Sequence, residues 1–147
     1  MQGLRGTVIA AVAVLGVPLV GCGSHDGHAV HAEHPAEVEH LPGSELSRVT
    51  LTEKAIERID LRTDSVREES MGGATRRVVP YSSIIYDPQG GTWVYTSPNP
   101  RTFVRARIVV DRIDGDRVYL NEGPPTGTVV ASVGVAELYG TEFQVGH

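Results

Sequence analysis

The chain contains little cysteine, lysine or aromatic residue, and each shortage removes a class of protein. A single cysteine among 147 residues has no partner in the chain, which excludes a fold held by its own disulfides. The chain has one lysine and 12 arginines. Its formal net charge is -5, which gives no reason to expect a phosphate backbone as ligand, so we predict no nucleic-acid partner. With 40% hydrophobic and only 5% aromatic residues, the chain can hold one modest domain plus an extension, but not two full domains.

Patterns of catalytic sites are also missing. Gly90 and Gly91 are not followed by the Gly-Lys-Ser/Thr of a phosphate-binding loop. Ser82 and Ser83 lack the flanking pattern of a nucleophile elbow, and the only histidine after the first 47 residues is His147, so a Ser-His-Asp triad is not expected. We predict that the protein is not an enzyme and requires no cofactor. A hydrolase would need a polar pocket that the sequence does not indicate.

The sequence has no hydrophobic run long enough to cross a membrane comfortably. The apolar run from Thr7 to Val20 has 14 residues, whereas a membrane-spanning helix needs about 20. Arg5 precedes this run, which is the charge pattern of a secretory signal peptide. The run ends at Leu19-Val20-Gly21-Cys22, which resembles the bacterial lipobox, in which the cysteine receives diacylglycerol and becomes the new N-terminus.

We therefore predict a lipoprotein signal peptide at residues 1–21, with Cys22 as the lipidation site. Two acyl chains, at about 0.8 kcal/mol per buried CH₂ group, would anchor the mature protein stably in membrane lipid. The mature chain would lie outside the cytoplasm, in the cell envelope or periplasm. The alternative is an incidental or buried cysteine that follows an uncleaved anchor.

Residues 22–47 are biased in composition and show no apolar periodicity, which predicts a flexible tether. The tether holds five of the six histidines, interleaved with acidic residues, and these are the candidate metal ligands: His25, His28, His31, His34 and His40. Neutral imidazole binds Zn, Cu(II) and Ni, so a flexible chain could gather several rings around one ion. A spacing of three residues drifts by about 60° per step around a helix, so a preformed site is not expected. The alternative is a solvated, pH-sensitive linker.

Residues 48–147 are expected to form one mainly β domain, an antiparallel β-roll or barrel-like fold with a single short helix. The longest alternating stretch, residues 103–111, predicts a strand with one wet face. Its inner residues are Val104, Ala106, Ile108 and Val110, and its outer residues are Phe103, Arg105, Arg107 and Asp111. Asp114-Gly115 then predicts a type I′ hairpin turn, and Val118 and Leu120 should face inward on the returning strand.

The two ends of this domain carry weaker signals. Arg48–Leu51 predicts a short strand, Thr52 an N-cap, and 53–59 a two-turn helix, followed by an alternating strand over 60–66. Residues 67–75 read as a polar linker that contains glycine. At the C-terminus, residues 136–140 predict one helical turn that ends at Gly140, after which Phe143 and Val145 should pair with the N-terminal strand.

Two proline- and glycine-bearing segments, 87–91 and 97–100, predict hairpin loops. Trp93 and Tyr95, which lie between them, share one strand face. They form either an exposed aromatic surface for partner docking or part of the core, and the core is the commoner role for such a pair.

The order of these elements resembles the periplasmic adaptor subunits, or membrane-fusion proteins, of resistance-nodulation-division (RND) efflux transporters. Val49–Glu53 and Ile59–Thr63 resemble the opening of those proteins, and Val79-Pro80-Tyr81-Ser82-Ser83-Ile84 resembles their "VP-x-x-A-I" entry into the membrane-proximal domain. The segments 92–95, 123–127 and 129–134 resemble the strands and the glycine-rich turn that follow. The resemblance covers about two-thirds of the chain.

The same resemblance implies a shortened protein. Full adaptors insert a β-barrel portion, a lipoyl-like pair and a long helical hairpin before the Val-Pro block, whereas only residues 67–75 are available here. The implied function is a non-catalytic lipoprotein that docks on an inner-membrane transporter or on a full-length adaptor, as an accessory component of efflux across the membrane. The competing hypothesis is a His-rich metal-binding lipoprotein that buffers or delivers Zn, Cu or Ni.

Overall fold

The computed structural model describes residues 34–144, which form a mainly β fold. Its strands are β1 (Ala36–His40), β2 (Ser47–Leu51), β3 (Arg62–Ser65), β4 (Arg67–Met71), β5 (Ala74–Pro80), β6 (Ile85–Tyr86), β7 (Thr92–Asn99), β8 (Thr102–Asp114), β9 (Arg117–Glu122) and β10 (Val129–Val133). Its helices are α1 (Glu53–Arg58), the 3₁₀ turn η1 (Tyr81–Ser83) and α2 (Val135–Glu142). Within this range, none of the helices has the length and apolar character required to span a membrane.

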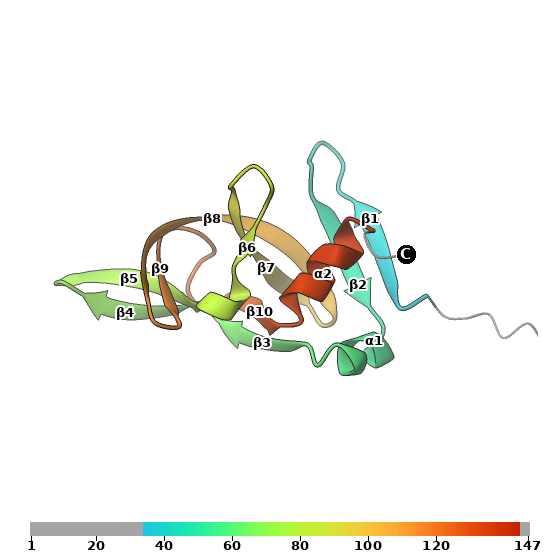
Figure 1. The fold of residues 1–147 in the computed structure, drawn as a ribbon, viewed down its shortest axis with the longest axis horizontal. Coiled ribbons are helices and arrows are strands. Elements are labelled where there is room, and N and C mark those ends of the chain that lie inside the picture. The colour runs from blue at the N-terminus through green and yellow to red at the C-terminus, as the bar shows by residue number, and fades with distance from the viewer. Residues whose placement is uncertain (1–33, 145–147) are drawn as a thin grey trace, which may run out of the picture. The chain divides into compact units, whose positions relative to one another are not determined.

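The strands form an antiparallel sheet that curls back on itself (Figure 1). Its main path runs β3-β10-β7-β8-β9-β5-β4, so β3 and β4 lie at opposite ends of the order. Only Val66 separates these two strands in the chain, and the sheet must therefore bend round until its ends meet. At this junction the Val66 N–H donates to the Thr128 carbonyl at 2.9 Å, and the Gly127 N–H donates to the Val66 carbonyl at 2.8 Å. The predicted β-roll is confirmed.

Two hydrophobic clusters pack on opposite faces of the central strands. On β7, Val94 belongs to one cluster and its neighbour Tyr95 to the other, and on β10 the neighbours Val130 and Ala131 divide in the same way. The inner cluster fills the roll with Val66, Val79, Val94, Ile108, Val118, Leu120 and Val130. The outer cluster lies beneath β2, α1 and α2 and contains Val49, Leu51, Ala55, Tyr95, Phe103, Ala131, Val135 and Leu138. Both faces of β7 and β10 are therefore buried where these residues lie.

This double burial corrects the prediction of one wet face on β8. The predicted inner face is buried or half-buried, with Ile108 1% exposed. On the opposite face, however, Phe103 and Arg105 are also buried, because the outer cluster covers that part of the strand. Only Arg107 and Asp111, farther along, are exposed as predicted. Strand alternation shows which residues share a face, but not whether another layer covers that face.

The β8–β9 hairpin is confirmed, but its turn is not of the predicted type. Asp114 pairs with Arg117, so the two-residue loop is Gly115-Asp116. Gly115 has a φ of 61° and Asp116 has no positive φ, which is the pattern of a type II′ turn with glycine first. Val118 and Leu120 are buried on β9 as predicted.

The predicted flexible tether is wrong at its C-terminal end, because Ala36–His40 is a strand that pairs with β2. Ala36 and Val38 pack against the outer cluster, while Glu37 and Glu39 point outward. The sequence did not show this alternation, because the segment is rich in histidine and glutamate and its composition resembles that of disordered segments. The described fold thus begins before residue 48.

The predicted polar linker over 67–75 is also wrong, because it forms most of the β4–β5 hairpin. Met71 pairs with Ala74 around Gly72 and Gly73, whose φ values of 60° and 84° fit a type I′ turn. Opposite charges face each other across the strands, with Glu69 opposite Arg76. The charged residues 67–69 concealed a strand that is defined by the glycine turn and by cross-strand pairing.

The helices confirm the predictions near residue 52 and correct those near the C-terminus. The Thr52 side chain accepts from the Ala55 N–H at 3.2 Å and caps α1 as predicted. Helix α2 is longer than the predicted single turn and continues through Gly140 to Glu142, because Leu138 and Glu142 are buried against the sheet. Phe143 is the C-cap of α2 rather than a strand residue, and Val145 lies outside the described residues.

The loops lie close to their predicted positions. Residues 87–91 connect β6 and β7 as a hairpin loop. The second loop is shorter than predicted, because β7 extends through Asn99, which pairs with Thr102. Only Pro100-Arg101 turn, and Arg101 takes a φ of 61°.

Ser83 in η1 is fully buried, and its Oγ has no hydrogen-bond partner within residues 34–144. A buried hydroxyl without a partner costs about 1–3 kcal/mol. We expect Ser83→Ala to raise the free energy of unfolding by about 1 kcal/mol, since alanine removes the unpaired oxygen and leaves only a small gap. Denaturant unfolding measures this change. Ser82→Ala, at the exposed neighbouring position, is the control and should leave stability unchanged; a Ser83→Ala variant less stable than wild type would contradict the prediction.

Candidate functional site

Most of the predicted lipid- and metal-binding residues lie outside the described part of the chain, namely Cys22, His25, His28 and His31. His34 and His40 are exposed, His34 just before β1 and His40 at its end. Within residues 34–144, no group of three or more histidine, cysteine, aspartate or glutamate residues could hold a metal ion. Lipidation and metal binding therefore stay predictions about the preceding segment.

Tyr95, a predicted docking residue, belongs to a buried polar cluster instead. Its hydroxyl donates to Glu142 Oε2 at 2.5 Å, and Arg105 Nε donates to the same oxygen at 2.7 Å. The side chains of Arg105 and Glu142 are only 6% and 2% exposed. Burial, followed by the hydrogen bond to Glu142, raises the pKa of Tyr95. Tyr95 is fully buried, which excludes it from an exposed docking surface and confirms the core alternative.

Trp93, the other predicted docking residue, is half-buried among arginines. The guanidinium carbon of Arg105 lies 4.7 Å from the centre of the Trp93 ring and 4.8 Å from that of Phe143, so this cation is stacked between two aromatic rings. Arg107 lies 5.4 Å from the Trp93 ring. The indole N–H donates to Asp87 Oδ2 at 2.8 Å, and this bond is the main cause that lowers the pKa of Asp87. These contacts give Trp93 a structural role and leave little of it available to a partner.

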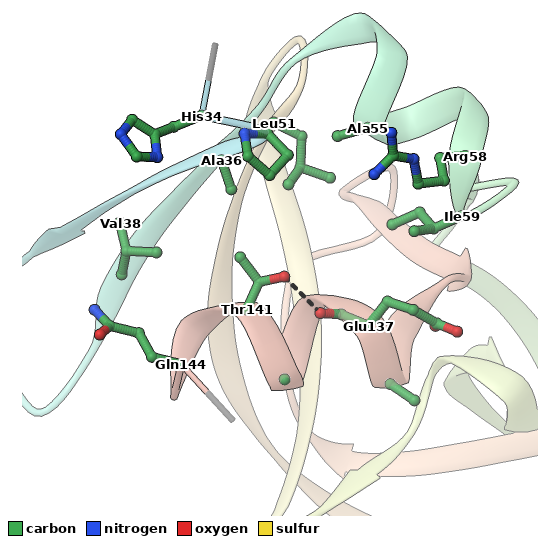
Figure 2. A pocket seen from close by; sticks show the side chains of 13 residues that line it. His34, Ala36, Val38, Leu51, Ala55, Arg58, Ile59, Glu137, Thr141 and Gln144 are labelled. Carbon is green, nitrogen blue, oxygen red and sulfur yellow. Dashed lines mark hydrogen bonds between the residues drawn. The ribbon is translucent and has the colours of Figure 1, made fainter. Parts of the chain in front are cut away.

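The structure adds a feature that the sequence did not reveal, an open groove between β1, α1 and α2 (Figure 2). Its volume is about 840 Å³, within the range of about 300–1,000 Å³ typical of small-molecule sites. Its floor and walls are mainly apolar and include Ala36, Val38, Leu51, Ala55, Ile59 and Gly140. Its polar lining consists of His34, Arg58, Glu137, Thr141 and Gln144.

The groove is hollow because small residues face it and because α2 is fixed elsewhere. Alanine or glycine lines each wall, as at Ala55 on α1 and Ala136 and Gly140 on α2. Thr141 Oγ donates back to the Glu137 carbonyl at 2.7 Å, inside α2, and does not bridge the groove (Figure 2). Helix α2 is instead held on the sheet through Leu138 and the Glu142 cluster.

Neither the groove nor the buried cluster of Glu142, Arg105 and Tyr95 is evident from the sequence. Residues 136–140 carried a helical signal, but which side of that helix would face α1 depends on contacts distant in sequence, such as Glu142 with Arg105 and with the Ser47 N–H at 3.4 Å. A glutamate is normally exposed to solvent unless it is paired. Only its buried partners reveal its role.

No protein-family model matches this chain, and no curated protein matches it. Among solved structures, the chain is similar to the NMR structure of a 180-residue part of SilB from Cupriavidus metallidurans CH34, which comprises the N-terminal metal-binding site and the membrane-proximal domain of that protein. The identity is 22%, the TM-score is 0.43, and the match covers 80% of this chain and 82% of that one. A likeness at this identity and TM-score assigns no function.

Proposed function

We propose that the protein is a non-catalytic envelope lipoprotein that docks on an inner-membrane transporter or a full-length adaptor, as an accessory component of an efflux system. Lipidation at Cys22 anchors it to the membrane, and the β-roll provides the contact with the partner. The roll is built from the segments whose sequence resembles the membrane-proximal domain of RND adaptors.

The observation that carries this proposal is where those segments lie in the fold. Val49–Glu53 and Ile59–Thr63 surround α1 between β2 and β3, and Val79–Ile84 runs from β5 through η1. Between the two blocks, the chain makes only the β4–β5 hairpin around Gly72 and Gly73. The position at which full adaptors insert their channel-reaching parts is therefore occupied by a tight turn. A shortened adaptor of this kind keeps the surface that faces the transporter.

The docking surface is better assigned to Tyr81 and Tyr86 than to Trp93 and Tyr95. Tyr81 on η1, within the Val-Pro block, is 46% exposed, and Tyr86 on β6, just after the block, is 53% exposed. Tyrosine is enriched at protein interfaces because it combines apolar area with a polar tip.

The alternative function is metal buffering or delivery by the histidines. His34 and His40 are exposed and available as ligands, and three further histidines precede them. In that case the β-roll would be a carrier for the metal-binding segment.

The test is in-cell photo-crosslinking of the acylated protein, with a photoreactive amino acid at Tyr86 and mass identification of the captured protein. A matched control carries the same group at Ile113, which is 45% exposed on β8. Both are repeated with His25, His28, His31 and His34 replaced by asparagine. These point substitutions leave β1 intact, whereas deletion of the segment through His40 would remove a strand.

Capture of a transporter or adaptor from Tyr86 but not from Ile113, with and without the histidines, is the result we expect. If neither position captures a transport component, and zinc, copper or nickel copurifies only with the intact histidine segment, the metal-binding alternative replaces the docking function.

A further inference from the structure

The groove between β1, α1 and α2 has the shape of a trough. On α2 the groove is lined by Ala136 and Gly140, a spacing of four residues that follows one side of the helix, and Gln144 lines it just beyond the C-cap Phe143. From residue 136 to the end of α2 at 142 this side extends about 9 Å, at 1.5 Å per residue. On α1, Ala55 and Ile59 recur at the same spacing. An elongated apolar trough suits a linear apolar chain better than a compact ring system.

A cation stands at the mouth of this trough. Arg58 is exposed at the end of α1, and Figure 2 shows its guanidinium reaching from the helix over the groove. It makes no ion pair within residues 34–144, although Glu137 lines the same groove. Figure 2 shows the Glu137 side chain running along α2, away from Leu51 and Ala55. An arginine presents a fork of N–H donors that matches a carboxylate.

An apolar trough with one arginine at its mouth is complementary to an amphiphile that has one apolar chain and one anionic head group. We propose that this groove binds a free long-chain fatty acid, with its alkyl chain along α2 and its carboxylate on Arg58. Burial of the chain removes apolar surface of both ligand and protein from water, and the open mouth leaves the head group partly hydrated.

The test uses the full mature chain, residues 22–147, with Cys22→Ser so that no attached lipid competes. Both hydrophobic clusters lie within this range, and a cooperative unfolding transition verifies the fold. Calorimetric titration compares laurate, which has the anionic head, with dodecanol, which lacks it. Ala136→Phe fills the trough from an exposed position on α2, and Arg58→Gln removes the cation.

We expect one laurate per chain, no binding of either probe to Ala136→Phe, and about tenfold weaker laurate binding to Arg58→Gln, the effect of one lost charge-assisted hydrogen bond. Dodecanol binding should be the same for wild type and Arg58→Gln. The controls are Ala74→Phe on the β4–β5 hairpin and Arg112→Gln, an exposed arginine on β8 outside the groove. Both controls should bind laurate as wild type does.

Three outcomes would overturn the proposal: wild type does not bind laurate, Ala136→Phe binds laurate as wild type does, or Arg112→Gln weakens laurate binding as much as Arg58→Gln does. Binding of phosphatidylcholine vesicles without binding of free laurate would likewise replace the fatty acid by a membrane surface. None of these results depends on capture of a transporter, so the two proposals fail separately.

Discussion

Glu142→Ala is expected to lower the free energy of unfolding by about 3–5 kcal/mol, the usual cost of removing one partner from a buried ion pair. The substitution leaves Arg105 buried without its carboxylate and removes the acceptor of the Tyr95 hydroxyl. It also frees the end of α2, the helix that forms one wall of the groove. Denaturant unfolding measures the loss, and hydrogen exchange over 135–142 shows whether α2 opens.

Glu39→Ala is the matched control, because it removes the carboxylate of an ion pair with Arg48 in which the side chains of Glu39 and Arg48 are 59% and 41% exposed. Exposed pairs contribute about 0–1 kcal/mol, so this variant should stay close to wild type. Replacing the buried cluster as a whole, with Arg105→Met, Glu142→Leu and Tyr95→Phe together, should recover much of the loss since no buried charge is left unpaired. Equal destabilisation by Glu142→Ala and Glu39→Ala would show that burial of the ion pair does not cause the loss.

Gly134→Val is expected to destabilise the fold by about 2–5 kcal/mol through two additive causes. Gly134 is the N-cap of α2 and has a φ of 77°, a conformation that costs a residue with a side chain about 1–2 kcal/mol. A Cβ at this position would also lie 3.3 Å from the Cγ1, Cδ1 and carbonyl oxygen of Ile59, where α1 ends. Ile59 lines the groove, so the variant should also distort the site.

Gly127→Val separates the two causes. Gly127 has a φ of 85°, but a Cβ there meets no atom within 4 Å, so only the backbone cost of about 1–2 kcal/mol applies. The difference between the two variants in denaturant unfolding measures the steric contact between α1 and α2. Equal losses would mean that the helices shift apart at no cost.

Local sequence signals gave the elements that short-range chemistry defines. Thr52 was identified as an N-cap because its hydroxyl serves an N–H only three residues away. The β8–β9 hairpin followed from a glycine at a tight turn, and Val118 and Leu120 from strand alternation. All of these depend on neighbours within a few residues.

The wrong predictions have the opposite cause, because they concern residues whose environment depends on contacts with other strands. Ala36–His40 and Arg67–Met71 were taken for tether and linker because their charged residues suggest solvent, yet each gains stability from pairing with a neighbouring strand. Phe103 and Arg105 were expected to be wet, but the outer cluster covers them. Composition predicts how a segment behaves on its own, whereas pairing with another strand changes which of its residues are buried.

The sequence by itself determined the mainly β class and the short helix after Thr52, because strand alternation and capping depend on adjacent residues. The anchor at Cys22 stays a prediction from its motif, outside the described residues. Tertiary structure alone decided that α2 lies over the sheet, that Glu142 is buried, and that a groove opens beside Arg58. Glu142 and Arg105 are separated by 37 residues, and the walls of the groove come from both ends of the described chain. Contacts of that range form only in the folded chain, so no local pattern could encode them.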